Sequence, residues 1–341
     1  MILFVIKAKI IHTKGIIIMK FYPLKLKPVT KSIIWGGNYL KENFGFSSDD
    51  ENIAEAWLAT CRPDGVNIIE NGEYEGKTFE DVINNAGIGE VCGDFDAFPL
   101  LIKFIDANDK LSVQVHPDDE YAQENGLDAG KTEMWYIVDC KEGAKLVYGL
   151  NTEEAPTFEE IEAANNNGTL SEMLNYADVH KGDCFFIPAG LVHAIGEGIV
   201  IAEIQQNSNT TYRLYDYDRV GKDGNKRELH IKRASEVIKT NFPVNFVSGK
   251  VITDNDGERT EILCKCDLFC VIKYNLACGK SAYFEEGSMK SIICLDGKGV
   301  ITCDGEDYPV GKGDTYLIPK ACDGFVIKSD DDKFEIIVSE A

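Results

Sequence analysis

The chain has 341 residues, enough for one large or two ordinary domains with substantial cores. Its 35 basic and 57 acidic side chains give a formal net charge of −22. Nucleic acid is therefore not expected as a partner, because its phosphates would be repelled. The 11 cysteines are scattered and contain no Cys-x-x-Cys pair, which favours a reducing, cytoplasmic setting over a disulfide scaffold.

The first twenty residues, MILFVIKAKIIHTKGIIIMK, contain short apolar runs. Lys7, Lys9 and Lys14 interrupt these runs, and no small-residue cleavage site follows, so the stretch resembles neither a secretory signal nor a bilayer span. We expect residues 1–19 to be a disordered extension or the product of an upstream start codon, with Met19 as the true first residue. No membrane partner is expected.

Local patterns predict an alternation of helices and strands in the first half of the chain. A helix is expected over residues 76–91, starting near Thr78, and strands are expected at 100–106, 111–116 and 133–139.

The later part of the chain begins with APTFEEIEAANNNGTLSEMLN, which predicts two short helices. Thr157 and Glu160 form a capping box for the first of them. After Ala177, short strands recur roughly every ten residues to the C-terminus, which is typical of a sandwich or barrel.

An internal repeat indicates the kind of barrel. Residues 179–195, VHKGDCFFIPAGLVHAI, resemble residues 310–326, VGKGDTYLIPKACDGFV, and both read Lys-Gly-Asp, three residues, then Ile-Pro. We predict a mainly β chain of two cupin-like (double-stranded β-helix) barrels with a small helical insertion. Residues 20–240 would form a catalytic cupin domain with helical segments. Residues 241–341 would form a degenerate barrel without a metal site, because the second copy lacks the equivalent of His193.

Polar side chains recur at every second position of LSVQVHPDDEY. Residues two apart on a strand share a face. Ser112, Gln114 and His116 are therefore expected to point into one interior, while Val113 and Val115 pack on the other face. A hydroxyl, an amide and an imidazole facing one interior indicate a site rather than a core.

The five histidines differ in their expected environment. His12 falls in the extension, and His180 and His230 are expected at the surface. Only His116 and His193 lie at inward-facing positions of predicted barrel strands. A single histidine is more often packed or exposed than a ligand, but two of them near a glutamate favour a metal site.

The glutamate is Glu133, which begins an apolar strand and shares a face with Trp135 and Ile137. A buried carboxylate needs a partner or a cation; a salt bridge to Lys131 or a place at the barrel rim is the alternative. A set of oxygens and nitrogens without thiolate suits one Zn²⁺ per chain, with Mn²⁺, Fe²⁺ or Co²⁺ possible. The candidate ligands are Gln114, His116, Glu133 and His193.

The closest cysteines are Cys264, Cys266 and Cys270. They could bind a soft metal, but no fourth ligand is spaced to complete a zinc site, so buried strand thiols are expected instead.

Six motifs follow one another in order across most of residues 21–220, and the QVHP element among them is specific. They are WGG at 35–37, AEAW at 54–57, LLIKFIDANDKLSVQVHPDD at 100–119, GKTEMWYIV at 130–138, IPAGLVHAI at 187–195 and EIQQNSNTTYRLYD at 203–216.

With these motifs the chain resembles the type I phosphomannose isomerases in their shorter bacterial form. The resemblance implies interconversion of mannose 6-phosphate and fructose 6-phosphate through a cis-enediol(ate). It also implies that a zinc ion is held at the four positions named above, and that Arg213 is catalytic, since its planar charged fork can clamp two oxygens. Lys131 would share the face of Glu133 and is a second catalytic candidate, as a possible base.

The phosphate of such a substrate needs donors away from the metal. Lys103 and Ser112 are the family-matched candidates. Trp35 is expected to form a wall beside the sugar, although a plain core position is equally compatible with its two neighbouring glycines. A small phosphorylated sugar is thus the expected partner of a monomer or weak homodimer.

Two positions depart from larger members of the family. Asn209 stands where they carry an aspartate, and Gly130 stands where a histidine is sometimes credited with ring opening. Asparagine cannot accept a proton at neutral pH. If a pair of histidine and carboxylate were essential, this chain would have to use another acid, such as Asp216 or Asp218.

Two other functions stay open at this point. A cupin dioxygenase could use the same ligands for Fe²⁺, although Lys103, Lys131 and Arg213 favour an anionic substrate. A non-catalytic sugar-binding cupin would keep the pocket and show no turnover.

Overall fold

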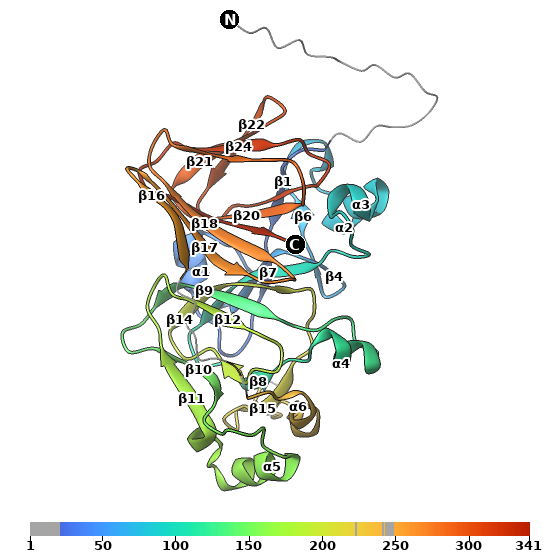
Figure 1. The fold of residues 1–341 in the computed structure, drawn as a ribbon, viewed down its shortest axis with the longest axis vertical. Coiled ribbons are helices and arrows are strands. Elements are labelled where there is room, and N and C mark those ends of the chain that lie inside the picture. Colours follow the sequence, from blue (N-terminus) through green and yellow to red (C-terminus); the bar gives the residue numbers. More distant parts are fainter. Residues whose placement is uncertain (1–20, 222–223, 241, 243–248) are drawn as a thin grey trace, which may run out of the picture.

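Strands dominate the chain, which confirms the prediction of a mainly β cupin protein. The computed structural model describes residues 21–221, 224–240, 242 and 249–341. The expected extension at 1–19, with His12 and the proposed start at Met19, lies outside the described residues. Two barrels are stacked along the long axis of the molecule (Figure 1).

The first barrel consists of two antiparallel sheets whose inner faces share one core. One sheet contains, in spatial order, β12 (Cys184–Ile187), β9 (Glu133–Cys140), β14 (Ile199–Gln206), β7 (Leu100–Ala107), β3 (Glu55–Ala59) and β2 (Val29–Lys31). The other contains β11 (Leu174–Asp178), β10 (Lys145–Leu150), β13 (His193–Ala194), β8 (Val113–Val115) and β15 (Tyr212–Tyr215).

The second barrel also has two sheets. The larger one contains, in order, β16 (Lys250–Asn255), β17 (Glu258–Lys265), β18 (Cys270–Leu276), β25 (Phe334–Glu340), β20 (Lys290–Asp296), β23 (Thr315–Ile318), β1 (Leu24–Lys27) and β6 (Ile68–Ile69). The smaller one contains β19 (Ser281–Phe284), β24 (Phe325–Ser329), β21 (Lys298–Cys303) and β22 (Glu306–Gly311). A short hairpin joins β4 (Cys61–Arg62) to β5 (Gly65–Val66).

Strand pairing crosses the division expected between residues 20–240 and 241–341. β1 pairs with β23, with Leu24 opposite Leu317, and β6 extends the same sheet. Strands β1 and β6, which precede most of the first barrel in the sequence, therefore belong to the second barrel. No local pattern of residues 24–27 reports this, because a strand's partner is set by tertiary packing. The division itself stays a prediction.

The helices lie outside the barrels (Figure 1). Thr78 and Thr157 each make a complete capping box, with Asp81 and Glu160. The helix expected over residues 76–91 is interrupted at Gly87, whose φ of 92° cannot continue a helix. The helices are α1 (Tyr39–Phe44), α2 (Phe79–Ala86), α3 (Ile88–Val91), α4 (Asp119–Glu124), α5 (Phe158–Asn167) and α6 (Ile231–Val237), with short 3₁₀ turns η1 (Gly72–Tyr74) and η2 (Leu170–Met173).

The alternation along β9 divides two cores. Met134 and Tyr136 pack into the core between the two barrels, whereas Trp135 and Ile137 face the interior of the first barrel, as the sequence predicts. All four are almost fully buried, and burial of Met134 and Ile137 contributes about 1.5–3 kcal/mol each. Glu133 begins on the same face as Trp135, so the strand directs its carboxylate inward.

The repeated Lys-Gly-Asp motif builds the same turn in both barrels. Gly182 and Gly313 have φ of 94° and 88°, and the following aspartates each accept a backbone N–H, from His180 at 2.7 Å and Gly311 at 2.9 Å. The strands after the turns, β12 and β23, both end at the Ile before the proline. The interior of the second barrel is filled by apolar side chains, and no histidine follows His230 in the sequence.

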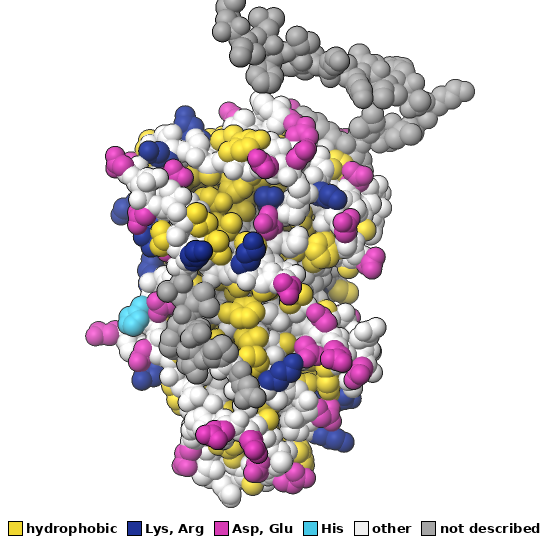
Figure 2. Space-filling view, in the orientation of Figure 1, with side chains coloured by type: hydrophobic (Ala, Val, Ile, Leu, Met, Phe, Trp, Pro, Cys, Tyr) yellow, Lys and Arg dark blue, Asp and Glu magenta, His cyan; other side chains and the backbone are white. Residues whose placement is uncertain are grey.

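The surface agrees with the composition. Acidic side chains are spread over the face shown in Figure 2 rather than gathered in one patch. Within the described residues, no helix is long and apolar enough to cross a membrane.

Candidate metal centre

Three adjacent strands place Gln114, His193 and Arg213 side by side. On β8, Gln114 lies directly opposite His193 of β13 on one side and Arg213 of β15 on the other. Neighbouring residues in an antiparallel pair have Cβ atoms about 4.5–5.5 Å apart. A ligand-bearing strand thus stands between a histidine and an arginine.

His116 and His193 are each 1% exposed, and both rings are held in one orientation. Their Nδ1 atoms lie 2.8 Å from Thr210 O and 2.9 Å from Leu191 O. A carbonyl can only accept, so Nδ1 carries the proton and each Nε2 presents a lone pair. The two Nε2 atoms are 3.2 Å apart. Two lone pairs at this distance repel one another unless a positive species lies between them, which fits a cation site.

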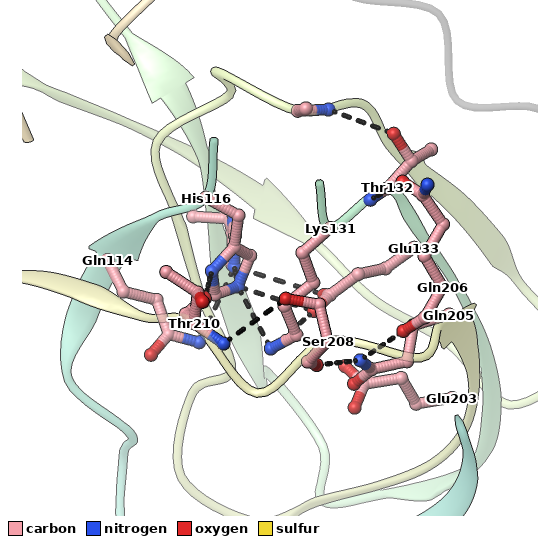
Figure 3. A network of polar contacts seen from close by, with 12 residues as sticks. Gln114, His116, Lys131, Thr132, Glu133, Glu203, Gln205, Gln206, Ser208 and Thr210 are labelled. Atoms are coloured by element: carbon pink, nitrogen blue, oxygen red, sulfur yellow. Dashed lines mark hydrogen bonds and ion pairs between the residues drawn. The ribbon is translucent and has the colours of Figure 1, made fainter. Parts of the chain in front are cut away.

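Glu133 closes this arrangement from β9. Its Oε1 lies 3.3 Å from His116 Nε2 and 2.9 Å from Lys131 Nζ, and its Oε2 lies 3.9 Å from His193 Nε2. Figure 3 shows His116, Lys131 and Glu133 pointing toward one another. Trp135 Nε1 also donates to Glu133 Oε2, at 3.1 Å.

The charges of the cluster follow from burial and from these neighbours. Burial opposes ionisation of Glu133, but the adjacent Lys131 ammonium, the largest opposing influence, helps to hold the pKa of the carboxyl well below its usual range. Burial, assisted by Lys131, lowers the pKa of His116 to about 3, and burial also lowers that of His193. The cluster is thus a carboxylate with two neutral imidazoles, the protonation state that binds a metal.

The donor set fits a divalent ion of the zinc type. Within the described part of the chain, His116, Glu133 and His193 form the one group of histidine, cysteine or acidic side chains whose potential ligand atoms all lie within 4.8 Å. The Gln114 amide supplies a fourth potential ligand. Its Nε2 lies 3.4 Å from His193 Nε2, and a flip of the amide would place its oxygen there instead. Two imidazoles, a carboxylate and a neutral amide suit Zn²⁺ and do not exclude Mn²⁺, Fe²⁺ or Co²⁺.

A polar pocket of about 320 Å³ opens beside the cluster. It collects side chains that lie far apart in the sequence, and both Gln114 and Lys131 reach it from the cluster. Of the residues predicted from the sequence, Trp35, Lys103, Ser112, Gln114, Lys131 and Arg213 line it. The sequence analysis did not identify Glu55, Glu203, Thr211 and Arg227, which also line it.

Lys103 forms ion pairs with two carboxylates. Its Nζ lies 2.8 Å from Glu203 Oε2 and 3.7 Å from Glu55 Oε2. Burial, together with the charge of Glu133, raises the pKa of Glu203 to about 7 in spite of Lys103. Trp135 Nε1 donates to Glu203 Oε1 at 2.7 Å, which fixes that carboxyl in the wall of the pocket.

Arg213 reaches the pocket on the side of Ser112. Its Nε donates to Ser112 Oγ at 3.2 Å and its Nη1 to Glu228 O at 2.9 Å. Burial and the neighbouring charge of Arg227 lower the pKa of the Arg213 guanidinium. The pocket therefore has excess positive charge at this end, although the whole chain is strongly acidic.

Arg227 is oriented by Asp216, which is 5% exposed. Arg227 Nε and Nη2 donate to the two oxygens of Asp216 at 2.8 and 2.5 Å, and Arg219 Nη2 donates at 2.6 Å. Asp218 instead pairs with Lys226. Asp216 and Asp218, the candidates to replace the aspartate of larger family members, therefore both form ion pairs with arginine or lysine side chains.

Gly130 and Asn209 also receive a structural explanation. A Cβ at Gly130 would lie 2.5 Å from Asp119 N, so no side chain fits there without a backbone shift. Asn209 is exposed and donates to Asp64 Oδ2 at 3.0 Å.

The two remaining described histidines lie away from the cluster. His180 is exposed, as predicted. His230 is not at the surface as expected but half-buried before α6, because its Nδ1 accepts the backbone N–H of Arg213 at 3.3 Å.

A sequence signal existed for some of the residues that were missed. Glu203 lies within the apolar strand IVIAEIQQ and is 3% exposed, so the argument applied to Glu133 applies to it equally. Arg227 lies in a polar loop segment, and nothing in its local sequence indicates the pocket.

Comparison with known proteins identifies the family of the chain. The family model for the catalytic domain of type I phosphomannose isomerase matches residues 23–145, and that for the cupin domain of mannose-6-phosphate isomerase matches residues 259–341. Mannose-6-phosphate isomerase ManA of Bacillus subtilis is 41% identical over 303 residues, covering 87% of this chain and 93% of the relative. Mannose-6-phosphate isomerase of Streptococcus mutans is 37% identical over 321 residues, covering 94% and 98%.

The crystal structure of mannose 6-phosphate isomerase from Bacillus subtilis superposes with a TM-score of 0.84 at 33% identity, covering 94% of this chain and 99% of that one. Phosphomannose isomerase variants from Salmonella typhimurium, at 15–16% identity and TM-scores of 0.71–0.73, share the fold. The chain therefore belongs to the type I phosphomannose isomerase family.

Proposed function

We propose that the chain interconverts mannose 6-phosphate and fructose 6-phosphate with the help of one Zn²⁺ ion held by Gln114, His116, Glu133 and His193. The names of its relatives support the reaction. The observation that carries the metal proposal is the approach of two Nε2 lone pairs to 3.2 Å beside a buried carboxylate. When bound, the ion would act as a Lewis acid on the sugar oxygens.

The reaction moves a proton between C1 and C2 of the open-chain sugar through a cis-enediol(ate), which needs a group that changes charge near neutral pH. Glu203 meets this need, because it lines the pocket and its pKa is raised to about 7. We therefore propose Glu203 as the proton carrier.

Lys131 and Arg213 stay proposed catalytic residues. Lys131 lies beside Glu133 with its ammonium 2.9 Å from Oε1, so it is placed to donate a hydrogen bond to an oxygen on which negative charge develops. Arg213 can stabilise the same charge from the other side of the pocket, since Ser112 and Glu228 hold its guanidinium in one orientation.

The substrate phosphate would be bound at the Ser112 end of the pocket. Ser112 offers a hydroxyl, and Arg227 supplies positive charge there. Lys103 remains a proposed substrate-binding residue, and its ion pair also holds Glu203 in place. Trp35, 3% exposed and lining the pocket, would form the wall beside the sugar. A cytoplasmic setting, and a monomeric or weakly dimeric state, remain proposals.

The test is a coupled assay in which phosphoglucose isomerase converts the fructose 6-phosphate formed from mannose 6-phosphate into glucose 6-phosphate. We expect turnover by the metal-loaded chain, loss of turnover with a chelator, and recovery when Zn²⁺ is added back. Binding of mannose 6-phosphate without turnover would contradict the proposal and favour a sugar-binding cupin. Oxygen uptake dependent on Fe²⁺ would favour the dioxygenase.

A further inference from the structure

Lys131 lies in the connection between α4 and β9, and residues 130–132 belong to no helix or strand. The Lys131 side chain is buried, and its ammonium lies 2.9 Å from Glu133 Oε1. A helix or strand fixes the direction of its side chains through its own backbone hydrogen bonds. The place of Lys131 in the pocket therefore depends on which other parts of the chain hold residues 130–132.

The side-chain amide of Gln206, the last residue of β14, holds this connection. Its Oε1 accepts the backbone N–H of Thr132 at 2.9 Å (Figure 3), and its backbone N–H donates to Thr132 O at 3.1 Å. Its Nε2 donates to both oxygens of Asp119 at 3.1 Å. Asp119 Oδ1 also accepts the backbone N–H of Gly130 at 2.8 Å. The residues on either side of Lys131 are thus tied to one amide and one carboxylate.

A third contact holds Lys131 itself, because its backbone N–H donates to Pro117 O at 2.9 Å. Pro117 follows His116, the proposed metal ligand, and Asp119 begins α4 two residues later. The turn that follows His116 therefore also anchors the connection that carries Lys131.

Gln206 and Asp119 do not line the pocket beside the metal cluster, whereas Lys131 does. Gln206 is 9% exposed and lines a separate groove of about 770 Å³ between the two barrels. Asp119 is exposed in the first turn of α4. An effect of either residue on turnover would therefore pass through residues 130–132.

We propose that Gln206 is a positioning residue for Lys131 and that Asp119 orients its amide. The inference rests on the proposed catalytic role of Lys131. Position 206 requires an amide, because one end must accept from the N–H of Thr132 while the other donates to the Asp119 carboxylate. A shift of about 1 Å in a reacting group costs up to about 100-fold in rate, so the amide matters for turnover although it lies outside the pocket.

Gln206→Glu tests the proposal with the change of one group. The new carboxylate can accept from Thr132, but it cannot donate to Asp119 and is repelled by it. We expect the amide hydrogens of residues 130–132 to exchange about tenfold faster, measured by mass spectrometry. In the coupled assay, kcat should fall by roughly 10-fold to 100-fold, with KM within about twofold and metal content unchanged.

A second substitution provides the rescue. Adding Asp119→Asn to Gln206→Glu exchanges the two groups between their positions. The asparagine can accept from the Gly130 N–H and donate to the carboxylate at position 206. Exchange and kcat should both return to within about threefold of the unaltered chain, because coupled substitutions at a direct contact are not additive.

A Lys131→Ala background separates positioning from a merely structural role. Since Gln206 acts through Lys131, Gln206→Glu should lower kcat there by less than about threefold. Asp119→Ala, at an exposed position, tests the same contact if Gln206→Glu does not fold, and it should also speed exchange and lower kcat. Glu120→Ala, which removes a charge from the next exposed residue of α4, is its matched control and should change neither.

Four results would overturn the proposal. They are faster exchange without loss of kcat, loss of kcat without faster exchange, a double variant no better than Gln206→Glu, and an equal loss of kcat with and without Lys131. Absence of turnover by the unaltered, metal-loaded chain would instead refute the proposed function. The exchange measurements would then still decide whether Gln206 and Asp119 hold residues 130–132.

Discussion

Lys103 and Glu203 are direct partners across β7 and β14, and their charged groups lie 2.8 Å apart in the wall of the pocket. Glu55 approaches the same ammonium at 3.7 Å. One lysine is thus shared between two carboxylates, and burial together with the nearby charge of Glu133 raises the pKa of Glu203 to about 7. For this reason we propose Glu203 as the acid that exchanges protons at neutral pH.

Glu203→Gln should lower kcat by roughly 100-fold or more, because the proton carrier is removed. Metal content should not change. Since the carboxyl is in its basic form only above its pKa, the unaltered enzyme should gain activity as the pH rises through about 7, and the variant should lack this rise. The measurement is kcat against pH in the coupled assay. Glu55→Gln is the matched control, and a rise near pH 7 that survives in Glu203→Gln would contradict the assignment.

Arg213→Ala should retain the metal but lose about 3 kcal/mol of transition-state stabilisation, or roughly 100-fold in kcat. Arg213→Lys should not restore the rate, because one ammonium cannot donate to Ser112 and Glu228 as the guanidinium does. Steady-state kinetics with metal analysis of the same samples checks this. If Arg213→Lys regained most of the activity, the orientation argument would be wrong.

Asp216→Asn should destabilise the fold by about 3 kcal/mol, because two arginines lose a buried partner. Burial opposes ionisation of Asp216, but Arg227 and Arg219 outweigh it and lower its pKa in the folded state. The stabilisation is therefore present above the unfolded pKa of about 3.9 and is lost as the pH falls below it. Urea unfolding from pH 7 to 3 should show a difference between the two proteins that is constant above about pH 5 and shrinks below about pH 4. A difference independent of pH would contradict this account.

Thr157→Ala should lower the free energy of unfolding by about 1 kcal/mol, through loss of the capping bond to the Glu160 backbone N–H at 3.2 Å. α5 lies at the far end of the molecule from the second barrel (Figure 1) and lines none of the pocket, so kcat and KM should not change. Thr157→Ser, which keeps the hydroxyl, is the control. Altered kinetics in Thr157→Ala would show that α5 influences the site.

The sequence predicted those features that depend on local periodicity. The two-residue alternation directs Ser112, Gln114 and His116 to one interior, and it places Glu133 beside Trp135. The Lys-Gly-Asp turns, whose glycines adopt positive φ, mark equivalent strands in both barrels. These features need no knowledge of distant partners, because side-chain direction on a strand follows from the backbone alone.

Features that depend on distant partners could not be predicted in the same way. The pairing of β1 with β23 joins strands that are far apart in the sequence, and Arg227 reaches the pocket from a loop held by Asp216. His230 is half-buried because Arg213 supplies its partner. Glu203 is a different case, since its position in an apolar strand was a usable signal.

Metal content, measured by mass spectrometry of the purified chain after loading with Zn²⁺ and gel filtration, tests the central claim most directly. Convergence of His116, His193 and Glu133 with the Gln114 amide predicts about one ion per chain, and less than about one-tenth of that in His193→Ala. Turnover should disappear with the ion and return with it. Stoichiometric metal in His193→Ala, or full turnover by metal-free protein, would contradict the account.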